Sequence, residues 1–306
     1  MWHVYMLSAL LGLVTALDLP AQQAFLGDLS GLAEVRRAVN LNSIIIQISR
    51  MIGPALAGII IGTLGTAPAF WLNGLSFIPV IGSLIIVRAR EKATRKVDSA
   101  LREFADGIRE LRNHPRLQDL MILVVLVTFL IFPIISIMPA FVGNVLHGDA
   151  QTLGSILAAS GAGALIGSAI FAPLIQAVKR VGKALIAAVL WMGGWLLVMA
   201  STSLFYVAIL AIFLASIAFP LVFVTALGLV QVIASPQMRA RLLSLFVTVS
   251  FGTQPISALL VGLSAQALTT SVAMEVNAVL LLCGGVLLAT RPGLRNWQMT
   301  TASTER

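Results

Sequence analysis

Long apolar segments recur along the chain, and shorter polar segments separate them. Because a bilayer-spanning helix needs about 20 mostly apolar residues, each long apolar segment predicts one such helix. The pattern predicts nine spans, at 4–25, 43–64, 68–88, 120–141, 153–176, 183–201, 204–226, 243–265 and 270–290. The fold class that follows is an all-α membrane protein whose first partner is the lipid bilayer.

Lysine and arginine residues are placed regularly between these spans. Apart from Arg50, they all fall in every other connection or in the C-terminal tail, and nine of them lie between Arg88 and Arg116. By the positive-inside rule, the connections that carry them face the cytoplasm. The sequence therefore predicts a multi-pass protein with a cytoplasmic C-terminus and an N-terminus outside.

The composition excludes several classes of function. Hydrophobic residues make up 58% of the chain and charged residues only 10%, whereas a soluble domain has roughly 25% charged residues. The basic connections account for the net charge of +8, so we predict no nucleic-acid partner. The single cysteine, Cys283, cannot form an intrachain disulfide. Because the sequence contains no catalytic or metal-binding motif, we predict that the chain is not an enzyme and has no cofactor or metal site.

The third connection differs from the others because its apolar residues recur at helical spacing. Between charged positions stand Val97, Leu101, Phe104, Ile108 and Leu111, which predicts an amphipathic helix on the cytoplasmic side. This helix divides the chain into four parts. They are three spans in 1–88, a linker in 89–118, six spans in 119–290 and a cytoplasmic tail in 291–306.

The first and last parts of the chain contain a weak internal repeat. The matching pairs are Ser43 with Ser244 and Pro54 with Pro255, each 201 residues apart, and Gly58 with Gly262, Ala69 with Ala273 and Asn73 with Asn277, each 204 apart. Both copies run in the same direction through the membrane, so the repeat is parallel. It predicts two six-span bundles, of which the first lacks its opening three helices, an arrangement known from secondary transporters.

The second predicted span contains a charge that is costly in a bilayer. Arg50 lies about 10 Å from the cytoplasmic helix end at a rise of 1.5 Å per residue, where a charge costs about 2.5–3.5 kcal/mol. Arg50 either snorkels to the interface or pairs with Asp18, which the preceding span places at a similar depth. Asp18 is alternatively a protonation site for antiport, although a neighbouring cation favours its charged form.

A stripe of helix-bending and small residues extends from the same position. Three residues follow Arg50 at steps of four, namely Pro54, Gly58 and Gly62, and Gly53 precedes the proline. Proline removes a backbone donor and clashes with the carbonyl four residues earlier. The spacing of the two later glycines lets helices approach closely. The stripe indicates either tight packing alone or a kinked helix on which two bundles rock.

The remaining polar residues at membrane depth allow two interpretations. They are Gln47, Asn73, Gln231, Gln254 and Asn277. We expect most of them to form hydrogen bonds between helices, and a minority to line a path for a substrate.

Several segments resemble exporters of the major facilitator superfamily. "RMIGPALAG" (50–58) is similar to the glycine-proline motif of the fifth helix in its drug/proton antiporters. "ALDLPAQQAFLGDL" (16–29), "MPAFVGNVLHGDAQTLGSILAASGAGALIGS" (138–168) and "LGLVQVIASPQMRARLLSLF" (227–246) resemble the enterobactin-exporter-like branch. The resemblance implies the superfamily fold, with this chain corresponding to family helices 4–12 and lacking the first three.

The resemblance also implies a function and a set of gating residues. It implies a proton-coupled exporter of a siderophore or drug-like molecule in a bacterial inner membrane, working by alternating access. The basic residues expected at the cytoplasmic gate are Lys179, Arg180 and Lys183 in one loop, and Arg239 and Arg241 in the next. The aspartate expected in the first of these loops is absent. The alternative expectation is therefore a truncated remnant that does not transport, or a chain whose start is mis-assigned.

Overall fold

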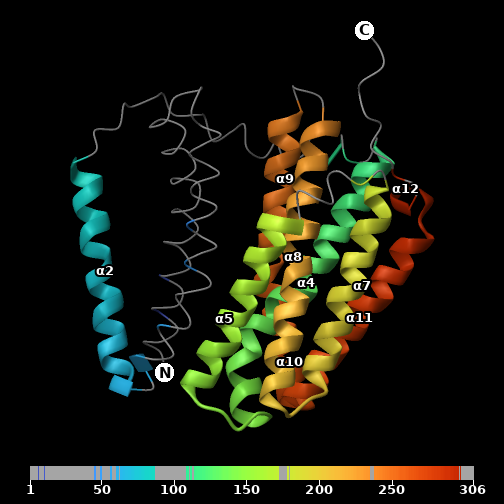
Figure 1. Cartoon of the computed structure of the whole chain (residues 1–306). Coiled ribbons are helices and arrows are strands. Elements are labelled where there is room, and N and C mark those ends of the chain that lie inside the picture. Colours follow the sequence, from blue (N-terminus) through green and yellow to red (C-terminus); the bar gives the residue numbers. More distant parts are fainter. Residues whose placement is uncertain are drawn as a thin grey trace. The chain divides into compact units, whose positions relative to one another are not determined.

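The computed structural model of the chain describes residues 63–86, 114–171, 180–234 and 238–295, together with isolated positions elsewhere. These residues form helices and the short connections between them, and none of them lies in a strand (Figure 1). The chain divides into two compact units, Met1–Ser49 with Ala67–Thr94, and Arg50–Thr66 with Arg95–Arg306. Most of the predicted linker 89–118 lies outside the described residues.

In the first unit, the structure describes one long helix, α2, from Thr66 to Ile86. It lies where the sequence predicts the third span, at 68–88. Large apolar side chains such as Phe70, Trp71 and Ile85 are exposed on its surface. A helix that presents apolar side chains to its surroundings is suited to contact with lipid or with other apolar helices.

Six of the described helices in the second unit are long and apolar enough to cross a membrane. Two of these spans change character along their length: α5 continues as a π-helix, η1, and α9 continues as α10. The bounds are α4 Pro115–Asn144, α5 Ala150–Ile166, η1 Gly167–Phe171, α7 Val181–Ala200, α8 Phe205–Ile233, α9 Arg239–Gly252, α10 Gln254–Ala267 and α11 Thr270–Thr290. Each corresponds to a span predicted from 120–141 onward, so hydrophobic segment length located these helices correctly.

The helix ends follow local sequence signals. α4 begins with Pro115, whose missing N–H is harmless in the first turn of a helix. α5 begins with a capping box in which the Asp149 carboxylate accepts a bond from the backbone N–H of Thr152 at 2.9 Å. This backbone bond, with a second from the Thr152 hydroxyl, lowers the pKa of Asp149. At the start of α11, the Thr269 hydroxyl accepts a bond from the backbone N–H of Val272 at 3.3 Å.

Helices α5 and α8 approach closely because small residues line their contact. A Cβ atom at Gly163 would collide with the carbonyl oxygen of Phe213, and one at Gly167 with that of Ile217. The hydroxyls of Ser160 and Ser216 lie 2.8 Å apart across the same contact. Glycines four residues apart with a hydrogen bond beside them are typical of packed membrane helices, which gain no hydrophobic energy from meeting in lipid.

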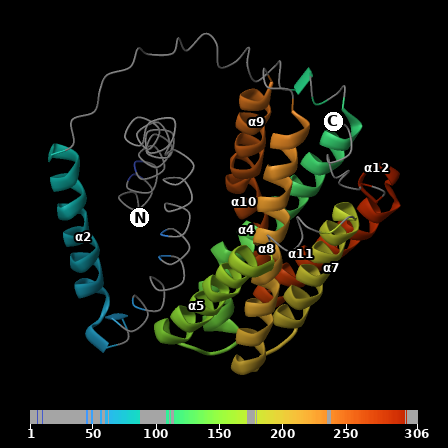
Figure 2. The same ribbon diagram turned by 45° about the horizontal axis from the view of Figure 1, so that its top comes forward.

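A short helix, α12 (Pro292–Arg295), follows the last span and packs on the end of the bundle. It contacts α4, α7 and α11, and both views show it beside the ends of α7 and α11 (Figures 1 and 2). Leu294 and Trp297 are buried there. Gly182 on α7 makes room for this contact, since a Cβ at Gly182 would collide with the Leu294 carbonyl oxygen. The beginning of the predicted tail 291–306 is therefore part of the folded bundle.

Candidate transport pathway and an ion pair at the helix ends

The central part of the predicted site lies outside the described residues. This applies to Gln47 and to the stripe with its proposed acid partner: Asp18, Arg50, Gly53, Pro54, Gly58 and Gly62. The pairing of Asp18 with Arg50 and the kink at Pro54 stay predictions.

Four of the predicted path residues are described, and they come from four different helices. Asn73 is exposed on α2, and Gln231 is exposed near the end of α8. Gln254 is half-buried and opens α10. Asn277 is buried on α11, where its side-chain amide donates to the carbonyl of Ala273 at 2.8 Å. Asn277 thus bonds within its own helix rather than to another helix, and a role of these residues in a substrate path stays a prediction.

The basic residues predicted at the cytoplasmic gate begin two of the helices. Arg180 caps the start of α7 and is exposed, as is Lys183 in the first turn. Arg241 is half-buried in the first turn of α9, and its Nη1 lies 3.6 Å from the sulfur of Met238. Lys179 and the side chain of Arg239 lie outside the described residues. A gating role for these residues stays a prediction.

The span predicted at 243–265 is interrupted at Thr253, between α9 and α10. Pro255 explains the interruption, since its nitrogen cannot donate to the carbonyl of Phe251 and its ring clashes with that carbonyl. The Thr253 hydroxyl bonds to the Val249 carbonyl at 3.1 Å, and the Thr253 carbonyl accepts from the N–H of Ser257 at 3.0 Å. Pro255, which the sequence repeat pairs with Pro54, therefore stands at a local interruption of one membrane-capable helix, Arg241–Ala267.

A phenylalanine cluster lies beside this break. It consists of five rings from three helices: Phe132 of α4, Phe219 and Phe223 of α8, and Phe246 and Phe251 of α9. Neighbouring ring centroids are 5.2–6.0 Å apart, within the range of favourable aromatic pairs. Phe246 is fully buried, whereas 40% of Phe251 is exposed. The cluster thus has a buried base and an accessible edge.

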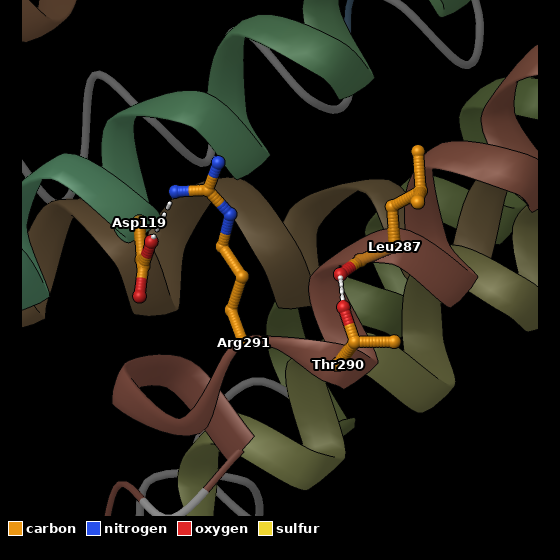
Figure 3. A network of polar contacts seen from close by, with 4 residues as sticks. All are labelled: Asp119, Leu287, Thr290 and Arg291. Atoms are coloured by element: carbon orange, nitrogen blue, oxygen red, sulfur yellow. Dashed lines mark hydrogen bonds and ion pairs between the residues drawn. The ribbon is translucent and has the colours of Figure 1, made fainter.

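An ion pair with one buried and one half-exposed partner joins the ends of two helices (Figure 3). The Nη1 atom of Arg291, at the end of α11, lies 3.0 Å from Oδ1 of Asp119 near the start of α4. The side chain of Asp119 is 9% exposed and that of Arg291 is 52% exposed. Oδ2 of Asp119 lies against Gly293, where a Cβ would be only 2.5 Å away. The contact joins α4 to the end of α11, and its two residues are 172 positions apart in the sequence.

Comparisons with known proteins identify the family. A family model of the major facilitator superfamily, described as transmembrane secretion effector, matches residues 1–306. The chain belongs to this family. Its members are membrane transporters rather than enzymes, which confirms the predicted fold class and the prediction that the chain is not an enzyme.

Curated relatives and a solved structure agree with this assignment. The chain is similar to the uncharacterized MFS-type transporter YfiS of Bacillus subtilis (strain 168), with 26% identity over 56% of the chain and 42% of that protein. It is also similar to the Staphyloferrin A transporter of Staphylococcus aureus (strain NCTC 8325 / PS 47), with 24% identity over 57% of the chain and 44% of that protein. The matches thus span less than half the length of either relative.

The fold is similar to that of a bacterial homolog of the human lysosomal transporter Spinster, solved in an inward-facing, unoccupied conformation. The TM-score is 0.60 at 15% identity, over 92% of this chain and 76% of that one. At this identity the likeness concerns the fold. The family model confirms the sequence resemblance stated above at the level of the superfamily.

In this transporter family member, sequence reasoning missed the ion pair and the phenylalanine cluster. Arg291 was interpreted only as a topological charge. A signal was present, because Asp119 is an acid close to the start of a long apolar helix, and a buried carboxylate requires a partner. No comparable signal marked the phenylalanines, which are ordinary residues of apolar spans.

Proposed function

We propose that this chain is the working part of a proton-coupled exporter of small organic molecules that operates by alternating access. The transmembrane secretion effector family supports transport. A relative whose name states that it transports staphyloferrin A supports a siderophore or drug-like substrate. The glycine-proline motif that includes Gly53 and Pro54 supports export, through its resemblance to drug/proton antiporters.

The observation that carries the proposal is the kinked helix α9–α10. In secondary transporters, substrate sites lie near the bilayer midplane. The break at Thr253 falls near the middle of a 27-residue membrane-capable segment, Arg241–Ala267. Beside the break are the phenylalanine cluster and the half-buried Gln254, so the middle of this span offers side chains for contact with a substrate.

Alternating access also needs bundles that move as rigid bodies. Contacts between the ends of α4, α7 and α11 support such rigidity in this bundle. The Asp119–Arg291 ion pair joins α4 to α11, and buried Leu294 and Trp297 of the α12 region pack against α7. The exposed basic residues Arg180 and Lys183 stand on the same side of the bundle, and their gating role remains part of this proposal.

Proton coupling requires an acid that can be protonated inside the membrane. The two acids described in the spanning helices lie near helix ends, and both are bonded: Asp119 to Arg291, and Glu275 to the hydroxyl of Ser201 at 3.2 Å. Asp18 is the remaining acid that the sequence places within a span. Proton coupling is therefore tested by a substitution of Asp18.

The proposal is tested with inverted membrane vesicles that contain the chain. Uptake of ethidium, tetraphenylphosphonium and staphyloferrin A is measured with and without an imposed pH gradient, acid inside. We expect at least one compound to accumulate only with the gradient, and Asp18→Asn to abolish this accumulation while Arg295→Gln preserves it. Accumulation that does not depend on the gradient contradicts proton coupling, and a lack of accumulation of all three favours the non-transporting remnant.

A further inference from the structure

The phenylalanine cluster has an arrangement that ordinary core packing does not require. Phe132, Phe219 and Phe223 are only half-buried, and Phe251 keeps 40% of its surface exposed. A side chain whose purpose is to fill the core is normally buried, as Phe246 is in the same cluster. The four accessible rings contact one another in sequence and therefore form a shared aromatic surface, and Phe246 is buried against one of them, Phe223.

The rings also occupy the middle of their helices. Phe132 lies near the midpoint of α4 and Phe219 near the midpoint of α8, and Phe251 is next to the break that divides α9 from α10. In transporters built from parallel repeats, the substrate lies at this depth, near the bilayer midplane. The aromatic surface is thus placed at the depth where a transported molecule rests.

The surroundings define the chemistry of the contact. In the sequences of α4, α5, α7, α8, α9, α10 and α11, aspartate, glutamate, lysine and arginine occur only near helix ends. At mid-depth, these helices therefore have no charged side chain that could form an ion pair with a ligand. They offer ring faces and ring edges, which attract other aromatic rings in stacked or edge-on geometries.

We propose that Phe132, Phe219, Phe223 and Phe251 form a subsite that binds an aromatic ring of the transported molecule. The proposal deepens the proposed function, on which it rests, by assigning the substrate class as organic molecules that carry an aromatic ring. Phe251 is the specificity-determining residue of the subsite, because it is the most exposed ring and contacts both Phe132 and Phe223, at 5.8 and 6.0 Å.

The test uses two cations of equal charge that differ in their rings, tetraphenylphosphonium and tetrabutylammonium. Binding of each to the 306-residue chain in lipid nanodiscs is measured by titration calorimetry, with empty nanodiscs subtracted. We expect tetraphenylphosphonium to bind more tightly. Phe251→Leu should lower this preference by about two- to tenfold, the range expected for losing one aromatic pair.

Two further variants exclude trivial explanations. Phe251→Tyr keeps the ring and should keep the preference. Phe205→Leu removes a ring from another aromatic pair, with Tyr206 near the start of α8, and should leave both affinities unchanged. Thermal unfolding of each variant shows whether it is folded.

Clear results overturn the proposal. It is wrong if the wild-type chain binds the two cations equally or binds neither, or if folded Phe251→Leu keeps the full preference. Because binding is measured at equilibrium without a gradient, the result is independent of transport. A chain that binds aromatic cations selectively but does not move them contradicts the proposed function and leaves this subsite standing.

Discussion

Replacing Arg291 by glutamine tests how far the Asp119–Arg291 ion pair stabilises the bundle. Two unit charges 3.0 Å apart attract each other by about 5 kcal/mol at an effective dielectric constant of about 20. The net contribution is smaller, because half of Arg291 is exposed to screening and Asp119 is desolvated by folding. A charged hydrogen bond of this kind contributes about 1.5–3 kcal/mol. We therefore expect Arg291→Gln to destabilise the chain by about 2 kcal/mol.

The assay is thermal unfolding in detergent, followed by intrinsic tryptophan fluorescence. For a chain of 306 residues, with an unfolding entropy of about 2.1 cal/mol/K per residue, about 2 kcal/mol corresponds to a fall in Tm of roughly 3 °C. Asp119→Asn should cost less, since it removes the buried charge instead of leaving it unpaired. The double variant should be more stable than Arg291→Gln alone for the same reason.

Arg295→Gln is the matched control, because Arg295 is an exposed arginine on the neighbouring helix α12. It should change Tm by less than about 1 °C, as surface substitutions usually do. The reasoning is refuted if Arg291→Gln is as stable as the wild type. It is also refuted if adding Asp119→Asn to Arg291→Gln recovers no stability.

Three further predictions concern other parts of the chain. Gly163→Ala should destabilise the chain by about 1–3 kcal/mol in the same thermal assay, because the new Cβ would collide with a backbone carbonyl of α8. Gly262→Ala is the control and should not destabilise the chain, because a Cβ at Gly262 has nothing within 4 Å. The pKa of Asp149 is lower in the folded chain than its ordinary 3.8. Its cap therefore stabilises α5 fully above pH 3.8, and this stabilisation is lost as pH falls through the lowered pKa. Protection of the amides in the first turn of α5 from hydrogen exchange, relative to their intrinsic rate at each pH, should fall at acid pH in the wild type, and an equal fall in Asp149→Asn would contradict this. If Asp18 pairs with Arg50, Asp18→Arg combined with Arg50→Asp should recover transport lost in either single variant, and a double variant as inactive as the singles argues against the pair.

Prediction from sequence succeeded where one segment decides its own structure. The six spans from 120–141 onward were found because a helix must satisfy its backbone internally in lipid, so apolar length alone reveals it. The interruption near Pro255 likewise depends on one segment, because proline acts on the carbonyl four residues before it in the same helix. Helix ends were less well placed: α8 continues to Ile233, whereas the sequence put its end near 226.

The candidate site was less predictable, because its members meet only through packing. Gln254 and Asn277 have the same polar amide, yet one is half-buried beside the helix break and the other bonds within its own turn. The facing direction of a side chain in an apolar helix cannot be inferred from periodicity when all faces are apolar, as in α8.

The sequence by itself determined the class of this protein, the six membrane-capable helices from 120–141 onward and the superfamily it belongs to, since each depends on local composition or on motifs within one segment. The tertiary structure decided which distant residues became partners. Asp119 and Arg291 are 172 positions apart, and the phenylalanine cluster draws on three helices. Apolar helices in lipid gain little from any one orientation, so small residues such as Gly163 and Gly182 select the contacts by allowing close approach. Those contacts bring the charges and the rings together.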